Sequence, residues 1–291
     1  MTAKPDKVTV VHTIAEVRQW IDAARKAGRT IGFVPTMGAL HEGHASLIRT
    51  SVAQQDATVV SIFVNPLQFG PNEDLDRYPR TLEADVQVVQ ECGADLVFAP
   101  SVREMYPRQQ LTFVDVEELT AGLCGASRPG HFRGVATVVA KLFNIVQPDV
   151  AYFGQKDAQQ AAVIERMVAD LSFPVRIVRC PTAREADGLA MSSRNSYLSP
   201  EERQAAPILY QALQAGADAV RAGERDAENV RRLMIERIQS EPLARIDYVD
   251  VVDEATFRTI SYVEGNIVLV GAIYIGSTRL IDNIPLAVPQ T

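Results

Sequence analysis

The sequence has few cysteines, no long apolar run and no excess of basic residues, and each of these absences excludes a class of protein. The three cysteines, Cys92, Cys124 and Cys180, are widely spaced and form no CxxC pair, which argues against a disulfide framework or a structural zinc site. No run approaches the roughly 18 apolar residues that a membrane span needs, and the N-terminus has no apolar signal core. We therefore expect a cytoplasmic protein.

The formal net charge of −7 gives the chain no bulk attraction to nucleic acid or to an anionic membrane surface. Any anionic ligand must be held by local arginines, lysines and backbone amides. The length of 291 residues exceeds the usual size of a single domain and predicts about two domains.

Short β-branched runs alternate with helical patterns over the first 180 residues. The predicted strands are Val8–Val11, Ile31–Val34, Thr58–Val64, Asp95–Ala99, Asp149–Phe153 and Val175–Cys180. The predicted helices between them are Ile14–Ala27, Gly43–Gln55, Thr81–Glu91, Val135–Val146 and Asp157–Asp170. This alternation predicts an α/β fold with a doubly wound parallel sheet, covered by helices on both faces. Ligands bind outside the carboxyl ends of such strands, so we expect His41, Asn65 and Lys156 to converge on one edge.

The pattern changes after Cys180 and predicts a smaller α+β domain with an antiparallel sheet. Ser199, Pro200 and Glu202 form a capping box that opens a helix to about Ala222, where Gly223 ends it. A second helix from Ala227 to Ile238 and three strands follow, the strands at Ile246–Val252, Asn266–Tyr274 and Thr278–Ile284.

The segment Pro35–His44 follows an apolar strand, turns at a glycine and enters a helix. Free backbone N–H groups and the helix dipole at such a turn favour an anion such as phosphate. His41 and His44 are three residues apart, so the HExxH zinc motif is absent. Both rings can donate to phosphate oxygens; the alternative is a pair of surface histidines that cap the helix.

Three further polar segments are candidates for the same site. Asn65 and Gln68 end a strand and suit a small polar substrate, although an Asn-Pro turn is also common in loops. Lys156 stands beside Gly154 and Asp157 at a predicted helix start, which favours phosphate binding or a simple helix cap. The serines and the arginine of Met191–Arg194 lie at the predicted domain junction, either as donors to a triphosphate or as an exposed linker.

Five motifs, in this order and spacing, resemble those of the pantoate–β-alanine ligases (pantothenate synthetases). They are PTMGALHEGH, NPLQFG, RPGHFRGV, FGQKDAQQ and DGLAMSSRN. The family is similar in its HxGH-like and lysine/serine loops to class I aminoacyl-tRNA synthetases and other nucleotidylyltransferases. The resemblance covers essentially the whole chain and implies a Rossmann-like nucleotide- and pantoate-binding domain over residues 1–182 and a C-terminal lid domain over 183–291.

The implied reaction is the ATP-dependent condensation of (R)-pantoate with β-alanine to pantothenate. It proceeds through a pantoyl adenylate and releases AMP and pyrophosphate. Mg²⁺ is expected to be coordinated mainly by the ATP phosphates, and no protein ligand for it is identified. The family resemblance also implies a homodimer, and no nucleic acid or membrane is expected as a partner.

Carried over by position, the resemblance gives His44 the acid role, with His41, Lys156, Ser192 and Arg194 as further catalytic residues. Gln68 is expected to hold both pantoate and β-alanine, Gln160 to hold pantoate, and Asn65 to belong to the substrate site. The expected ATP-binding residues are Pro35, Thr36, Met37, Gly38, Ala39, Leu40, His41, Glu42, Gly43, His44, Gly154, Gln155, Lys156, Asp157, Ala183, Met191, Ser192, Ser193 and Arg194.

Gln155 and Ala158 stand where many relatives carry an acid and an aromatic residue, and Ala183 stands where many carry valine. Contacts made by backbone atoms would be unaffected by these changes, whereas a side-chain contact at Ala183 would lose packing against the adenine. Two other functions fit the motifs less well. One is a nucleotidylyltransferase that stops after nucleotide transfer to a phosphorylated acceptor. The other is a non-catalytic nucleotide-binding module.

Overall fold

The computed structural model describes residues 7–71 and 73–289, and its chain divides into two compact units. The first unit comprises Met1–Val116, Arg128–Gly154 and Val163–Pro181. The second comprises Glu117–Ser127, Gln155–Ala162 and Thr182–Thr291, and so includes two short segments from earlier in the chain. No helix within the described ranges is long and apolar enough to cross a membrane.

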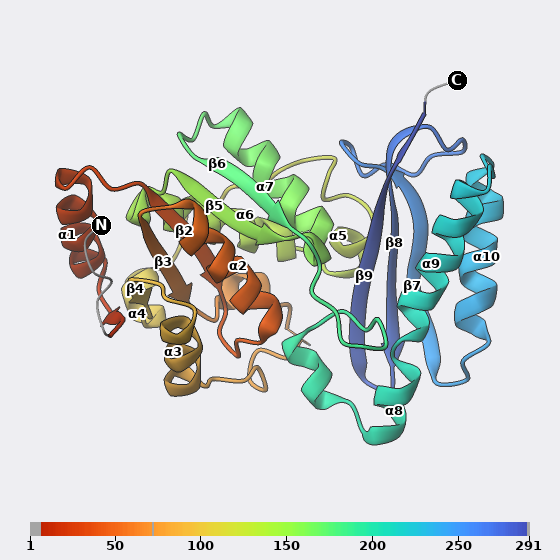
Figure 1. Cartoon of the computed structure of the whole chain (residues 1–291), viewed down its shortest axis with the longest axis horizontal. Coiled ribbons are helices and arrows are strands. Elements are labelled where there is room, and N and C mark those ends of the chain that lie inside the picture. The colour runs from red at the N-terminus through yellow and green to blue at the C-terminus, as the bar shows by residue number, and fades with distance from the viewer. Residues whose placement is uncertain (1–6, 72, 290–291) are drawn as a thin grey trace. The chain divides into compact units, whose positions relative to one another are not determined.

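A six-stranded parallel sheet organises the first unit, in the order β1-β4-β3-β2-β5-β6 (Figure 1). Its strands are β1 (Thr9–Val11), β2 (Ile31–Thr36), β3 (Ala57–Ile62), β4 (Leu96–Phe98), β5 (Val150–Gly154) and β6 (Arg176–Cys180). The α/β class with a parallel sheet is thus confirmed.

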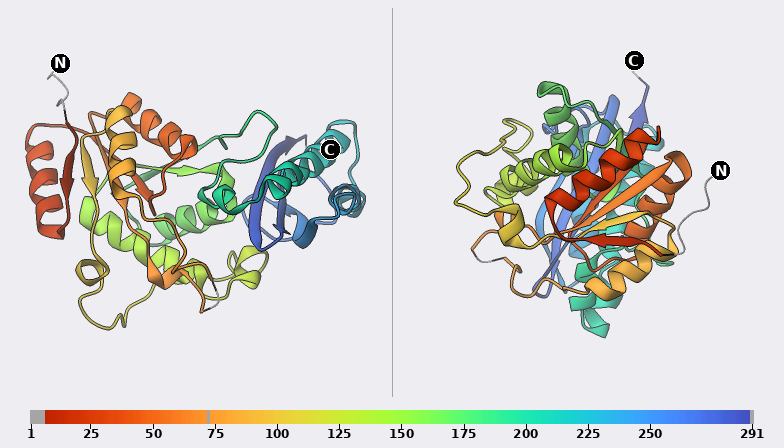
Figure 2. Two further views of the ribbon diagram at one scale, coloured as in Figure 1. Left: turned by 90° about the horizontal axis from the view of Figure 1, so that it is seen from below. Right: turned by 90° about the vertical axis from the view of Figure 1, so that its left-hand side faces the viewer.

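Helices cover both faces of this sheet (Figure 2). They are α1 (Ile14–Lys26), α2 (Glu42–Gln54), α3 (Leu82–Glu91), α4 (Val102–Met105), α6 (His131–Val146) and the part of α7 (Ala158–Asp170) that belongs to this unit. Phe33 of β2 packs edge-on against Phe143 of α6, with ring centroids 6.4 Å apart. The next residue, Val34, joins a core cluster with Leu47 and Ile48 of α2. Successive strand side chains point to opposite faces, so α6 and α2 cover opposite faces of the doubly wound, Rossmann-like sheet.

The second unit is built on a three-stranded antiparallel sheet in the order β7-β8-β9. Its strands are β7 (Ala244–Asp253), β8 (Gly265–Ile275) and β9 (Thr278–Val288). Helices α9 (Ile208–Arg221) and α10 (Ala227–Gln239) pack together against the sheet (Figure 2, left). Leu213, Met234 and Leu269 lie in the core that these elements share. The predicted α+β arrangement with an antiparallel sheet is confirmed.

The prediction of a single helix from Ser199 to about Ala222 is wrong, because this segment forms two helices, α8 (Pro200–Ala205) and α9. The break falls at Pro207, which has no N–H with which to continue the helical hydrogen bonds. The predicted capping box is present, since Ser199 Oγ accepts from Glu202 N and Glu202 Oε2 accepts from Ser199 N. A second difference is that α6 begins at His131, four residues before the predicted start at Val135.

Candidate active site

The switch point of the parallel sheet lies between β2 and β5. From β2 the chain continues to β3 and β4, whereas from β5 it continues to β6 in the other direction. In open α/β sheets, ligands bind outside the carboxyl ends of the strands at such a point. These ends are Thr36 and Gly154, so the Pro35–His44 segment begins where the topology favours a ligand.

The turn between β2 and α2 is held by a buried carboxylate. Asp85 of α3 accepts hydrogen bonds from the backbone amides of Ala39 (3.1 Å) and Leu40 (2.7 Å). Gly38 has a φ of 87°, and a Cβ there would lie 2.9 Å from Asp85 Oδ2, so only glycine fits this approach. The expectation of free amides for an anion is therefore wrong for Ala39 and Leu40, whose donors are engaged within the protein. Their contact with ATP stays a prediction.

His41 and His44 cap the start of α2, and their rings contact each other at a 45° tilt, with centroids 4.1 Å apart. Nδ1 of His41 accepts from the Gly43 amide (3.1 Å), and Nδ1 of His44 accepts from the His41 amide (3.3 Å). A ring nitrogen that accepts an N–H bond carries no proton, so each neutral ring has its proton on Nε2. The alternative interpretation, a pair of histidines that cap the helix, is therefore correct for the two Nδ1 atoms, which accept backbone N–H groups at the start of α2. The same bonds give each ring a fixed Nε2–H donor.

Asn65 connects the end of β3 to Gln68 in the short 3-10 helix η1 (Pro66–Gln68). Its Nδ2 donates to Gln68 Oε1 (3.1 Å) and to the Gly134 carbonyl (3.2 Å). Its Oδ1 accepts from the Tyr106 hydroxyl (2.8 Å) and from the Leu67 amide (3.3 Å). Burial raises the pKa of Tyr106, so the hydroxyl keeps its proton for this bond. Both donors and both acceptor positions of the Asn65 amide are engaged within the protein.

Gln68 presents its Nε2 group, because Oε1 is already bound to Asn65. The residue is 7% exposed, and Nε2 lies 3.0 Å from the sulfur of Met37 in the segment predicted to bind ATP. The structure therefore places the predicted substrate ligand Gln68 beside the segment after β2. Nε2 is a donor suited to a carboxylate or hydroxyl oxygen.

A second polar network holds the main chain of Gln68. His131 Nδ1 donates to the Gln68 carbonyl (2.8 Å), and its Nε2 accepts from Arg128 (3.1 Å). Arg128 also makes two 2.7 Å hydrogen bonds to Glu73. Burial alone would raise the pKa of Glu73, but the Arg128 hydrogen bonds and charge outweigh it and hold this pKa below its usual value. The same segment contacts Gly134, where a Cβ would lie 2.2 Å from the Leu67 carbonyl oxygen.

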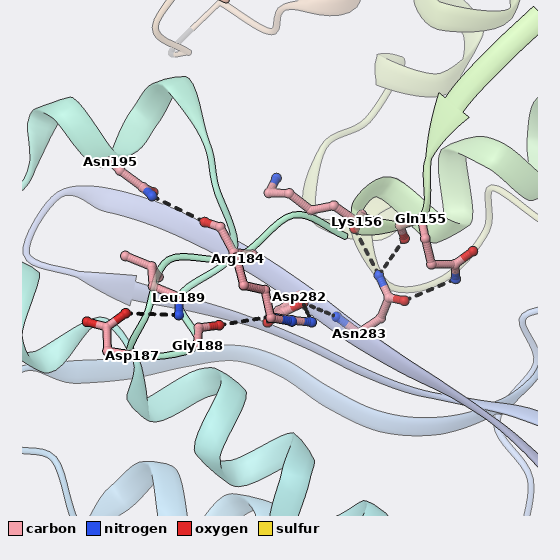
Figure 3. Close-up of polar contacts among 10 residues, drawn as sticks. Gln155, Lys156, Arg184, Asp187, Gly188, Leu189, Asn195, Asp282 and Asn283 are labelled. Carbon is pink, nitrogen blue, oxygen red and sulfur yellow. Dashed lines mark hydrogen bonds and ion pairs between the residues drawn. The ribbon is translucent and has the colours of Figure 1, made fainter. Parts of the chain in front are cut away.

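The Lys156 turn belongs to the second unit. Lys156 lies in the 3-10 helix η2 (Gln155–Asp157), directly before α7, which begins at Ala158 rather than at the predicted Asp157. Asn283 of β9 donates through Nδ2 to the carbonyls of Gln155 (2.8 Å) and Lys156 (2.9 Å) (Figure 3). Lys156 Nζ lies 3.9 Å from Asp157 Oδ2. The Lys156 side chain thus begins from a main chain that β9 holds in place.

Residues Ala183 to Met191 form a narrow hairpin in the same unit. The Met191 amide donates to the Ala183 carbonyl (2.9 Å), and Arg184 pairs with Ala190 in an antiparallel bridge. The structure therefore brings together Ala183 and Met191, two of the predicted ATP-binding residues. Gly188 forms the tip at a φ of 92°, where a Cβ would lie 2.3 Å from the Tyr210 ring.

Arg184 anchors the hairpin to β9. It donates to both oxygens of Asp282 (2.5 and 2.9 Å) and to the Gly188 carbonyl (3.0 Å) (Figure 3). Its guanidinium carbon also lies 3.9 Å from the centroid of the Tyr210 ring. Burial raises the pKa of Asp282, and the Arg184 hydrogen bonds and charge oppose that shift. The pair fixes the hairpin without using a predicted ATP ligand.

Ser192 directly precedes the 3-10 helix η3 (Ser193–Tyr197), which includes Ser193 and Arg194. Ser192 Oγ accepts from the Arg194 amide (3.3 Å) and so caps this helix. Asn195 donates to the Ala190 carbonyl (3.1 Å), which attaches η3 to the hairpin. The serine and arginine therefore follow directly from a segment whose geometry β9 fixes.

The neighbouring glutamines of α7 have different environments. Gln159 is buried, accepts from the Cys124 amide of α5 (Cys124–Ser127) and donates to the carbonyls of Leu119 and Gly122. Gln160 is partly exposed, and no described residue makes a hydrogen bond to its side chain. Gln159 thus has a structural role within the second unit. The expected contact of Gln160 with pantoate stays a prediction.

Several residues that shape these segments escaped sequence analysis. They are Asp85, Tyr106, Arg184, Asp282 and Asn283. Each is a single polar residue in a helix, a strand or a loop, whose partner lies far away in the sequence, so no local pattern marks it. Among residues 7–71 and 73–289, no group of three or more His, Cys, Asp or Glu side chains is placed to hold a metal ion.

Comparison with known proteins identifies close relatives over nearly the whole chain. The family model described as pantoate-beta-alanine ligase matches residues 9–285. A pantothenate synthetase of Moorella thermoacetica is 58% identical over 279 residues, which cover 96% of this chain and 99% of that protein. The solved pantothenate synthetase of Thermus thermophilus is 49% identical with a TM-score of 0.91, covering 95% of this chain and 99% of that one.

A further solved structure is that of a pantoate-beta-alanine ligase from Francisella tularensis, complexed with beta-gamma ATP and β-alanine. It is 35% identical with a TM-score of 0.78, and the match covers 95% of this chain and 97% of that one.

Proposed function

We propose that this chain, which belongs to the pantoate–β-alanine ligase family, makes pantothenate through a pantoyl adenylate. It is a ligase that joins pantoate to β-alanine and uses ATP as a substrate. One observation carries the proposed route. His41 and His44 present main-chain-oriented Nε2 donors just beyond the carboxyl end of β2, where a phosphate group would bind.

The route follows from the chemistry of a carboxylate, which reacts poorly with an amine because its leaving group is poor. In the first step, a carboxylate oxygen of pantoate attacks the α-phosphorus of ATP. The new P–O bond forms as the bond to pyrophosphate breaks. In the second step, the β-alanine amine attacks the acyl carbon, and AMP leaves with the electron pair of the broken C–O bond. No protein nucleophile is needed, and the enzyme contributes positioning and charge stabilisation.

In the first unit, we assign the phosphate contacts to the two histidines and the substrate contacts to Gln68. His44 takes the acid role and donates through Nε2 to a phosphate oxygen on which charge develops, with His41 as the second donor. Gln68 binds pantoate and β-alanine through Nε2. Asn65 acts on the substrates by holding Gln68, because its own amide is fully engaged.

In the second unit, we assign Lys156, Ser192 and Arg194 to the ATP phosphates and Gln160 to pantoate. Ammonium, hydroxyl and guanidinium groups are suitable donors for phosphate oxygens. Ala183 and Met191 lie at the paired ends of one hairpin, which supports their assignment to the adenine side. We further propose that residues 183–291 act as a lid over residues 1–182, because the adenylate must be kept from water.

Three finer features complete the proposal. Mg²⁺ binds mainly to the ATP phosphates, because it keeps several waters and uses few protein carboxylates. The enzyme works in the cytoplasm, where ATP is available. It is a homodimer, as the family resemblance implies.

The test is ATP–pyrophosphate exchange, measured with and without (R)-pantoate. The proposal predicts exchange that requires pantoate, proceeds without β-alanine, and turns into pantothenate formation when β-alanine is added. Exchange that depends on a phosphorylated acceptor instead would support a nucleotidylyltransferase. ATP binding without any exchange would support a binding module and contradict the proposed enzyme.

A further inference from the structure

Two consecutive residues of β9 bind two separate segments of the second unit. Asp282 and Asn283 are 5% and 4% exposed, respectively, and each uses its side chain within the unit. Asp282 binds Arg184 in the hairpin, and Asn283 binds the main chain of the Lys156 turn (Figure 3). The backbone N–H of Asn283 also donates to Asp282 Oδ1 (2.8 Å), and this bond connects the two interactions.

The Asn283 side chain makes three hydrogen bonds to η2. Nδ2 donates to the carbonyls of Gln155 (2.8 Å) and Lys156 (2.9 Å), and Oδ1 accepts from Gln155 Nε2 (3.1 Å). Both donors and one acceptor of a single rigid amide therefore hold two consecutive residues. This fixes the peptide from which the Lys156 side chain starts, and with it the volume that the ammonium group can reach.

Asp282 holds the hairpin through a buried ion pair. The two oxygens of Asp282 receive a bidentate pair of bonds from Arg184, which in turn donates to the Gly188 carbonyl at the hairpin tip. A buried carboxylate with a fork-like guanidinium partner has one preferred geometry. The hairpin that contains Ala183 and Met191 and the turn that contains Lys156 are therefore both held by β9.

We infer that Asn283 is a positioning residue for ATP activation, acting through Lys156. It sets the main chain of the Lys156 turn relative to the hairpin, so that the ammonium group and the adenine-side segment meet one nucleotide at fixed spacing. This inference rests on the proposed role of Lys156 in binding the ATP phosphates. A purely structural Asn283 would stabilise the second unit without any energetic coupling to Lys156.

The experiment is a double-mutant cycle of Asn283→Ala and Lys156→Ala in the full-length enzyme, read by pantoate-dependent ATP–pyrophosphate exchange. A displacement of about 1 Å in a catalytic group can cost about 100-fold in rate, so we expect Asn283→Ala to lower kcat/KM for ATP by about that factor. The KM for β-alanine in the full reaction should stay unchanged. The double variant should be no slower than Lys156→Ala alone, because residues that act as a unit are not additive.

The matched control is Asn266→Ala, which removes an exposed asparagine of the neighbouring strand β8. Its exchange rate should equal that of the wild type. If the losses of Asn283→Ala and Lys156→Ala multiply in the double variant, the inference is overturned while the role of Lys156 stands. If Lys156→Ala exchanges at the wild-type rate, the proposed role of Lys156 fails and the inference fails with it.

Asn283→Asp covers the case in which Asn283→Ala does not fold. The aspartate keeps the side-chain volume and an acceptor for Gln155, but replaces the donor to both carbonyls with an oxygen. We expect a similar loss in kcat/KM for ATP, again without further loss in combination with Lys156→Ala. Wild-type exchange by Asn283→Asp would overturn the inference.

Discussion

Asp85 Oδ1 lies 2.7 Å from the backbone nitrogen of Leu40, across 45 residues of sequence. Its other oxygen accepts from the Ala39 amide, so one carboxylate holds two consecutive peptides of the turn after β2. Asp85 is 2% exposed and comes from α3. The turn leads directly into His41, so the geometry of the two histidines that we assign to the ATP phosphates depends on a residue that need not touch the nucleotide.

Asp85→Ala should reduce both stability and ATP affinity. It leaves the Ala39 and Leu40 amides without their acceptor, which costs about 1–3 kcal/mol in the free energy of unfolding when a buried group loses its partner. Urea unfolding and the KM for ATP in the exchange assay measure the two effects. Glu83→Ala, an exposed change on the same helix, should alter the free energy of unfolding by less than about 0.5 kcal/mol. Wild-type stability of Asp85→Ala would show that the turn does not need this carboxylate.

His44→Ala should abolish most of the adenylation activity while the fold survives. The change removes the Nε2–H donor assigned to the developing phosphate charge, and loss of one such donor costs about 10²–10³-fold in kcat. Pantoate-dependent pyrophosphate exchange measures the loss, and circular dichroism tests the fold. His12→Ala removes an exposed histidine of the same unit and should leave exchange unchanged. Near-normal exchange by His44→Ala would remove His44 from its assigned role.

The regular elements were predictable because their burial imposes a pattern on the sequence. Ile31–Val34 is continuously apolar because β2 is covered on both faces, and this is the signal that predicted it. The start of α6 was missed because Gly130, His131 and Gly134 look like a loop. Gly134 is a glycine because the helix approaches the Leu67 carbonyl closely, which no local pattern indicates. The break between α8 and α9 has a local signal, because Pro207 stands inside the predicted helix and has no N–H to donate.

The site was predictable only in its local part. His41 and His44 share one helix start, so their spacing in the sequence indicates their proximity in space. Asp85 and Asn283 act across 45 and 128 residues, respectively. Sequence patterns do not specify which carboxylate meets which turn when the partners come from different elements. The parallel sheet and β9 create those pairs, and only the folded chain reveals them.

Asn65→Asp should weaken pantoate binding by releasing Gln68. Aspartate still accepts from Tyr106 and Leu67, but it cannot donate to Gln68 Oε1 or to the Gly134 carbonyl. The uncompensated acceptors cost about 1–3 kcal/mol of stability, and the freed Gln68 raises the KM for pantoate. The same charge change at an exposed site, Asn266→Asp in β8, is the control and should be nearly neutral.

A double variant separates the two possible roles of Asn65. If Asn65 acts by holding Gln68, then Asn65→Asp should raise the KM for pantoate no further once Gln68→Ala is present, because the two residues form one unit. Independent effects on the KM for pantoate would instead assign Asn65 its own contact with the substrate. Both results are measured in the exchange assay at saturating ATP.

The Arg128–Glu73 pair should make the stability of the first unit depend on pH in acid. The pKa of Glu73 is held below its usual value because Arg128 outweighs the effect of burial. As pH falls, the unfolded chain therefore takes up this proton first, at about pH 4.3. The stabilisation is fully present above that pH and is lost as the pH falls through the lower pKa of the folded state.

Glu73→Gln removes this titration and isolates its effect. The difference in free energy of unfolding between the wild type and Glu73→Gln should be largest near neutral pH and should shrink below about pH 4.3. Urea unfolding across that range measures it, with Glu83→Gln at an exposed position as the control. A difference that is independent of pH would contradict the role of the charge. Because Arg128 and His131 hold the Gln68 carbonyl, Glu73→Gln should also raise the KM for pantoate at neutral pH, which links this ion pair to the substrate ligand rather than to stability alone.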